Sequence, residues 1–180
     1  MAKMTGPAVA GVGGSSIFER VQARLIEMEN RKREIALHKT AKEEFFVFQL
    51  GGIRFAAEFA YVGTSASKFF FTPLFHMPEQ LAGIFSYEGG VHTLFHLDLL
   101  MGLPPSQPKL LVVFESHELK IGVLVDEIES PVELDLAARI NAIGEGEEAP
   151  PFVDGYLPFA GERIFHLDVE ALLKSEKVWI

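Results

Sequence analysis

The sequence contains no cysteine, which excludes disulfide bonds, thiolate metal sites and cysteine nucleophiles. It also lacks an apolar run long enough to cross a bilayer, so we expect no direct membrane insertion. The 180 residues carry a net charge of −9. An acidic protein repels phosphate backbones, so nucleic acid is not an expected partner. A chain without cysteine suits the reducing cytoplasm, where we expect the protein to reside.

Signatures of catalysis are also missing. The sequence has neither the Gly-x-Ser-x-Gly elbow of serine hydrolases nor a glycine-rich phosphate loop. His92, His96 and Asp98 share one strand face, and His166 and Asp168 repeat the last two, so a metal-dependent enzyme is one alternative. Helix capping by the two aspartates and duplication of the histidine explain this pattern better. We therefore expect no enzymatic activity, no metal and no cofactor.

Charge divides the chain into two regions. Residues 1–43 carry eight basic and five acidic groups, net +3, whereas residues 44–180 carry eight and twenty, net −12. Glycine and proline near the start predict a disordered tail over residues 1–15. An amphipathic helix and linker are expected over residues 16–43. Its apolar side chains fall on one face, namely Phe18, Val21, Leu25, Met28 and Ile35.

Two interpretations of this helix remain open. Its apolar face could pack against the protein's own body, as most amphipathic helices do. Alternatively, the five apolar residues form a partner-binding helix, or the helix pairs in a short coiled coil. The oligomeric state therefore stays open at this point.

The remainder of the chain contains an internal repeat. Phe-His-Leu-Asp occurs at residues 95–98 and again at 165–168, and residues 48–62 align without a gap with residues 114–128. Two copies are too few for a solenoid, so the repeat predicts two similar small modules packed together. We assign residues 44–105 mostly to the first module and residues 106–180 mostly to the second.

Both modules have the pattern of short strands joined by turns. Glycine pairs such as Gly51-Gly52 supply the positive φ angles of tight hairpins. Four hairpins are expected, with strands at 45–50 and 53–57, 84–87 and 91–97, 110–115 and 119–125, and 155–159 and 162–167. Short helices are expected at 99–101, capped by Asp98, at 136–142, and at 169–175, capped by Asp168. The fold class is therefore mainly β, with two small barrels of about five strands each.

Several motifs in residues 44–173 resemble the CheW-like domain, a coupling adaptor of chemotaxis signalling. They are Phe-Val-Phe-Gln-Leu-Gly at 46–51, Gly-Ile-Phe-Ser-Tyr-Glu-Gly at 83–89, Leu-Phe-His-Leu-Asp-Leu-Leu at 94–100 and Ile-Gly-Val-Leu-Val-Asp-Glu-Ile at 121–128. The resemblance implies two SH3-like five-stranded barrels around a shared core, which agrees with the repeat.

The resemblance also implies a non-catalytic scaffold in two-component signal transduction and motility. Its expected partners are the regulatory domain of a histidine kinase and the helical hairpin of a chemoreceptor, and recruitment to membrane receptor arrays or a cell pole would follow. The family's contact positions fall on Val62, on Gly83 and on the loop 86–89. The candidate partner-binding residues are therefore Val62, Gly83, Phe85, Ser86, Tyr87, Glu88 and Gly89, with Phe85 and Tyr87 as aromatic anchors.

This sequence departs from the family pattern in the same loop. The family has Asn-Leu-Arg-Gly where this chain has Ser-Tyr-Glu-Gly at 86–89, so Glu88 reverses a positive charge. A carboxylate cannot replace the two-pronged hydrogen bonding of a guanidinium. The reversal would reject the ordinary partner and select a basic one. An alternative function is therefore a divergent adaptor of a motility, pilus or polar localisation system, which binds another partner through its first helix without kinase coupling.

Overall fold

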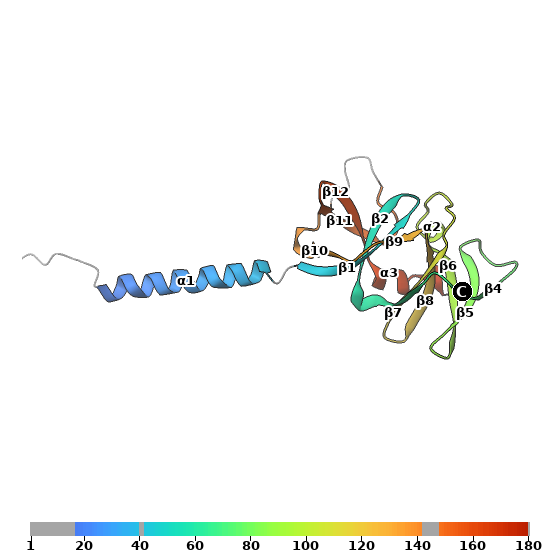
Figure 1. Ribbon diagram of the computed structural model, residues 1–180, viewed down its shortest axis with the longest axis horizontal. Coiled ribbons are helices and arrows are strands. Elements are labelled where there is room, and N and C mark those ends of the chain that lie inside the picture. Colours follow the sequence, from blue (N-terminus) through green and yellow to red (C-terminus); the bar gives the residue numbers. More distant parts are fainter. Residues whose placement is uncertain (1–16, 40–41, 142–147, 180) are drawn as a thin grey trace, which may run out of the picture. The chain divides into compact units, whose positions relative to one another are not determined.

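The computed structural model describes residues 17–39, 42–141 and 148–179. The chain divides into two units between Thr40 and Ala41. The first contains α1 (Ile17–Lys39), which confirms the predicted helix, and the second contains all the strands (Figure 1). The predicted tail at 1–15 lies outside the described residues. Within the described part of the chain, no helix is long and apolar enough to cross a membrane.

Sheet A contains six strands and is built on the first predicted hairpin. Its strands are β1 (Lys42–Leu50), β2 (Ile53–Glu58), β9 (Glu127–Ile128), β10 (Val132–Asp135), β11 (Val153–Phe159) and β12 (Glu162–Leu167). The strand order is β10-β1-β2-β12-β11, and β9 also pairs with β1. Gly51 and Gly52 form the β1–β2 turn with φ angles of 56° and 79°, as the hairpin prediction required.

Sheet B contains six strands in the order β3-β7-β8-β6-β5-β4. They are β3 (Val62–Ala66), β4 (Phe71–Pro73), β5 (Leu81–Tyr87), β6 (Gly90–His96), β7 (Leu110–Ser116) and β8 (Leu119–Val125). All four predicted hairpins are therefore present. The repeat alignment is also structural, because Phe48 opposes Phe55 in the first hairpin and Phe114 opposes Ile121 in the third.

Each sheet takes strands from both halves of the repeat. In sheet A, β2 runs parallel to β12, and in sheet B, β6 runs parallel to β8 (Figure 1). A boundary at residue 105 therefore does not separate the two sheets. Where the sequence predicts two modules of about five strands, the structure has two mixed six-stranded sheets. Each sheet includes a hairpin from the other half of the repeat.

Alternating side chains of the strands supply three hydrophobic clusters. Phe45 and Val47 of β1 belong to a small cluster within sheet A, and Leu111 and Val113 of β7 belong to one within sheet B. The intervening residues Phe46, Phe48, Val112 and Phe114 join a larger cluster that draws on both sheets. Period-two alternation thus gives each sheet its own core and a shared core. Because both sheets contribute to the shared core, they form one body.

The short helices differ in detail from the prediction. Asp168 caps α3 (Val169–Leu173) by accepting from Ala171 N, as predicted. Asp98, however, lies inside α2 (Leu97–Leu100), where His96 is the N-cap residue, so its predicted capping role is wrong. Its buried carboxylate instead accepts from the Leu99 and Ser106 amides. The helix expected at 136–142 is a single 3₁₀ turn, η2 (Leu136–Ala138), and residues 142–147 lie outside the described residues.

Candidate partner-binding surface

The structure brings the start of β3 next to the β5–β6 hairpin. Val62, the first residue of β3, is half-buried against the large core cluster. Its neighbour Gly63 lies so close to Tyr87 that a Cβ atom there would be 2.8 Å from the Tyr87 hydroxyl. Two segments that the sequence separates by more than twenty residues therefore lie side by side.

The hairpin tip itself is exposed and carries an ion pair. Glu88 and Gly89 form the two-residue turn between β5 and β6, with φ angles of 48° and 76°. Both residues and the preceding Ser86 are exposed, whereas Tyr87 is half-buried. The Glu88 carboxylate accepts a hydrogen bond from Lys120 Nζ of β8. The charge reversal at residue 88 is therefore matched by a cation of the protein's own.

Lys120 is the centre of a small charged group. Its Nζ lies 5.3 Å from the centre of the Tyr87 ring and 3.3 Å from Glu115 Oε2. Hydrogen bonding and the charge of Lys120 lower the pKa of Glu88, and the same pair raises the pKa of Lys120. Burial raises the pKa of Tyr87, and Glu115 and Glu88 add to the rise. Near neutral pH, Glu88 and Lys120 are therefore charged and Tyr87 is neutral.

Gly83 and Phe85 face the interior. Phe85 is only 4% exposed and belongs to the core cluster within sheet B, so the prediction that it is an exposed anchor is wrong. Gly83 is also buried, and a Cβ atom there would lie 2.2 Å from the carbonyl oxygen of Thr72 in β4. Glycine at this position allows β4 to pack against β5. In this structure Gly83 therefore shapes the surface without being part of it.

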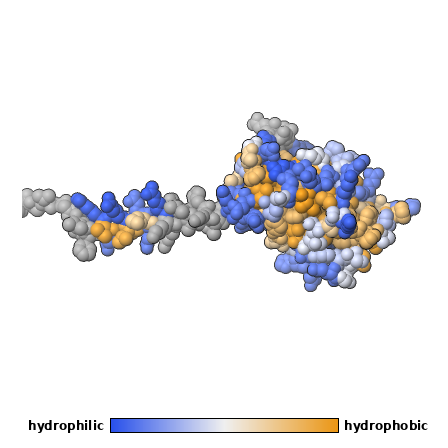
Figure 2. All heavy atoms as spheres, viewed as in Figure 1, coloured by the Kyte–Doolittle hydropathy of each residue, from blue (hydrophilic) through white to orange (hydrophobic). Residues whose placement is uncertain are grey.

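A strongly apolar segment adjoins the hairpin. We define the aromatic segment as residues 69–77, which include β4 and the loop after it. Phe70 is 97% exposed and Phe75 is 80% exposed, while Phe71, Leu74 and Met77 are also exposed. In Figure 2, apolar residues are visible in the region that β4 and β5 occupy in Figure 1. Exposed apolar groups gathered in this way are typical of interaction surfaces.

A pocket connects the aromatic segment with the hairpin and β3. It has a volume of about 620 Å³. Its lining comes from both edge strands of sheet B, β3 and β4, and from β5, β6 and β7. Thr64 and Ala66 of β3 and Tyr87 of β5 are among the lining residues. The surface formed by Val62, the hairpin tip, the aromatic segment and this pocket is the candidate partner-binding surface.

Sequence reasoning did not identify the aromatic segment as functional. The signal was present, since residues 69–77 contain four phenylalanines, a leucine and a methionine. Such a run ordinarily indicates a buried strand. Pro73 is the feature that argues against burial, because proline cannot donate a hydrogen bond in a central strand. The run is accordingly an edge strand followed by an exposed loop.

The histidines considered as metal ligands do not form a metal site. Within residues 17–39, 42–141 and 148–179, no group of three or more His, Asp or Glu side chains could hold a metal ion. His166 is buried, and its Nδ1 lies 2.6 Å from Asp154 Oδ1. Asp154 also accepts from Arg139 at 2.5 Å, and the second ring nitrogen of His166 lies 3.7 Å from Glu58. These four residues form a polar chain that links β2, β11 and β12.

The helix residues lie in the other unit of the chain. Val21, Leu25 and Met28 are 51%, 56% and 58% exposed. The helix spans Phe18 and Ile35 as well, but the side chains of these two lie outside the described ones. The helix and the domain are separate units, so its five predicted contact residues form a candidate surface of their own.

Comparison with known proteins identifies the domain. The search of curated proteins found no match. Among solved structures, the scaffolding protein CheW from Thermoanaerobacter tengcongensis matches with a TM-score of 0.62 at 17% identity, and the match covers 70% of this chain and 88% of that protein. The model of the CheW-like domain family matches residues 44–177. This chain belongs to the CheW-like domain family.

Proposed function

We propose that the protein is a non-catalytic adaptor of chemotaxis-type signal transduction, which couples a receptor to a histidine kinase through protein contacts. The observation that carries this proposal is the exposed aromatic segment beside the hairpin tip, in a domain of the CheW-like family. A similar fold belongs to a protein described as a scaffold. An adaptor needs only recognition surfaces, and the charged groups described above serve to pair with one another.

The physical basis of recognition would be burial of the aromatic segment. Phe70 and Phe75 leave most of their surface in water in the free chain, so covering them gives a favourable hydrophobic contribution. Aromatic anchors of this kind carry much of the binding energy at protein interfaces. The polar hairpin tip would form part of the rim. We assign this surface to contacts with the kinase regulatory domain and the receptor hairpin, with recruitment from the cytoplasm to receptor arrays or a cell pole.

Binding to the CheW-like regulatory domain of a histidine kinase from the same genome tests the proposal. Titration calorimetry should detect a complex with the unmodified chain, and Phe70→Ser should weaken it. Ile26→Ser is the matched control, because Ile26 is 59% exposed but lies in α1. If neither the kinase domain nor the receptor hairpin binds the unmodified chain, coupling of these partners is refuted.

The acidic hairpin tip favours a second candidate, an adaptor of the same type with a different receptor. Glu88 displays a carboxylate where the family displays an arginine, and Lys120 holds it in place. Glu88→Arg alone would bring two cations together. The double change Glu88→Arg with Lys120→Glu keeps the ion pair and presents a guanidinium at the tip. Stronger binding of an ordinary chemoreceptor hairpin by the double variant, with Lys120→Glu alone as control, would support the second candidate, and unchanged binding would contradict it.

A further inference from the structure

The apolar stripe of α1 has the spacing of a coiled coil. Phe18, Val21, Leu25, Met28 and Ile35 follow one another at intervals of three and four residues, if Lys32 is counted between the last two. These are the a and d positions of a heptad repeat, with Phe18 and Leu25 at a, and Val21 and Met28 at d. One side of α1 is accordingly apolar and the opposite side charged (Figure 2).

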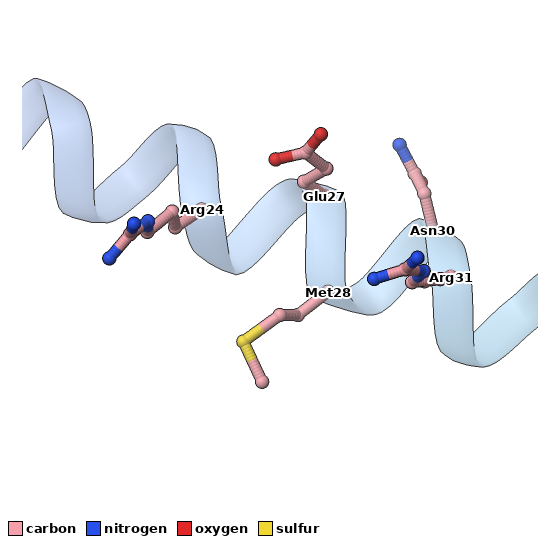
Figure 3. A pocket seen from close by; sticks show the side chains of 5 residues that line it. All are labelled: Arg24, Glu27, Met28, Asn30 and Arg31. Carbon is pink, nitrogen blue, oxygen red and sulfur yellow. The ribbon is translucent and has the colours of Figure 1, made fainter.

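A helix with this stripe requires a partner for its stability. Most of the stability of a helix in a protein comes from packing of its amphipathic face rather than from its intrinsic propensity. In this chain, α1 is a separate unit and Leu25 and Met28 are each more than half exposed. Figure 3 shows Met28 and Arg24 pointing to one side of the helix, opposite to Glu27 and Asn30. A pocket of about 610 Å³ lies on the helix and is lined by these four residues and Arg31.

We propose that α1 pairs with α1 of a second copy of this chain in a parallel two-stranded coiled coil. The charges that flank the stripe indicate both the occupant and its direction. Arg24 and Arg31 occupy g positions, and Glu29 occupies an e position. In a parallel pair, each g residue faces the e residue five positions further along the other helix. Arg24 of each copy then faces Glu29 of the other, so the dimer contains two attractive pairs.

The antiparallel arrangement is disfavoured by the same charges. If Leu25 packs against Met28 of an antiparallel partner, g positions face g positions. Arg24 then faces Arg31 twice, and like charges at such positions repel. Lys32 at an a position adds specificity, because a single lysine at a favours a defined register at some cost in stability. The charges at the e and g positions of α1 are therefore complementary in the parallel direction only, although Lys32 of each copy faces the other there and lowers the stability of the pair.

Sedimentation velocity of the full chain tests self-association. The mass should rise from 19.9 kDa towards twice that value with increasing concentration. Leu25→Ser should weaken the dimer about tenfold or more, because it removes an a-position side chain from the seam. Ile26→Ser should leave the dimer intact, although it removes a side chain of similar size and exposure, because Ile26 lies outside the stripe. A chain that stays monomeric, or equal effects of the two changes, would overturn the proposal.

Two further variants test the direction of pairing. The chain has no cysteine, so Val21→Cys introduces a single thiol. A parallel dimer places the two thiols opposite each other, and mild oxidation should give a covalent dimer, whereas an antiparallel dimer opposes Val21 with Lys32. Arg24→Glu should weaken a parallel dimer, and adding Glu29→Arg should restore it. If Arg24→Glu strengthens the dimer, or if α1 captures a different protein while the chain itself stays monomeric, the parallel homodimer is wrong.

Discussion

Replacement of Gly83 by alanine should destabilise the domain because it forces β4 away from β5. The Cβ atom would lie 2.2 Å from the Thr72 carbonyl oxygen, and ordinary contact begins at 3.4 Å. The backbone of β4 must therefore move away by 1.2 Å, the difference between these two distances. This strand is held by only three residue pairs, and the pair opposite Gly83 contains Pro73. Overpacking typically costs about 1–3 kcal/mol, so we expect Gly83→Ala to cost about 2 kcal/mol.

Gly63→Ala is the matched control. The Cβ atom there would lie 2.8 Å from the Tyr87 hydroxyl and 2.9 Å from Glu115 Oε2. Distances this short require the neighbouring atoms to move. Here those atoms are the ends of side chains rather than backbone, so they can move at little cost. Alanine also restricts the unfolded chain, which stabilises the native state by about 0.4–1 kcal/mol where the backbone permits it. We therefore expect Gly63→Ala to change the free energy of unfolding by less than about 0.5 kcal/mol.

Urea unfolding followed by circular dichroism measures the difference. With a slope of about 2 kcal/mol/M, Gly83→Ala should lower the midpoint by about 1 M, and Gly63→Ala should leave it nearly unchanged. Equal midpoints for the two variants would refute the packing argument. Kinase binding adds a second measurement. If Gly83→Ala abolishes binding without changing the midpoint, Gly83 contacts the partner directly and our assignment of a purely structural role is wrong.

Three further predictions concern the partner surface, the interior and the dependence on pH. Phe70→Ser should weaken kinase-domain binding about 30-fold in calorimetry, as expected for an aromatic anchor. The urea midpoint should stay constant, and a fall in the midpoint would instead show that Phe70 supports the fold. Asp98→Ala should cost about 3 kcal/mol in urea unfolding, because it leaves the Leu99 and Ser106 amides without their acceptor, and a loss below about 1 kcal/mol would contradict this. Arg54 lowers the pKa of Glu129 below its ordinary 4.5, so the stabilising effect of the pair is complete above pH 4.5 and is lost as the pH falls through the lowered value. Between neutral pH and about pH 3, the free energy of unfolding should therefore fall further for the unmodified chain than for Glu129→Gln in urea unfolding. Equal losses in the two proteins would refute a stabilising role for the Arg54–Glu129 pair.

Local patterns allowed the hairpins and helix to be predicted but not their assembly. Alternation and glycine turns specify which neighbouring strands pair, because both signals act within a few residues. They contain no information on which hairpin packs beside which. The exchange of hairpins between the two halves places β2 parallel to β12 and β6 parallel to β8. It depends on pairing between residues 110 positions apart in the first case and 28 positions apart in the second. For this reason the sequence predicts the strand pairs but not the exchange of hairpins between the two halves.

Single residues show the same limit at the candidate surface. The sequence predicts that Glu88 selects a basic partner, but it does not reveal the pairing of Glu88 with Lys120, which lies 32 residues away in the chain. Phe85 and Phe70 are equally apolar, yet one is 4% exposed and the other 97%. What separates them is their place in sheet B, since β5 lies between two strands and Phe70 comes just before the edge strand β4. Exposure is a property of the assembled sheet and cannot be assigned from residue type.

The two candidate surfaces rest on different physics and therefore have separable consequences. The aromatic segment would bind by burying rigid side chains on a folded sheet, which is a property of one copy. The stripe of α1 would act by joining two copies of the chain. Once one copy of the dimer has bound a clustered partner, binding of the other copy to a neighbouring partner is an intramolecular step. Linking two sites in this way can raise overall affinity about 10²-fold or more without any new contact. Loss of α1 pairing would then weaken attachment to a clustered array while leaving the affinity for a single kinase domain unchanged, whereas loss of Phe70 would weaken both.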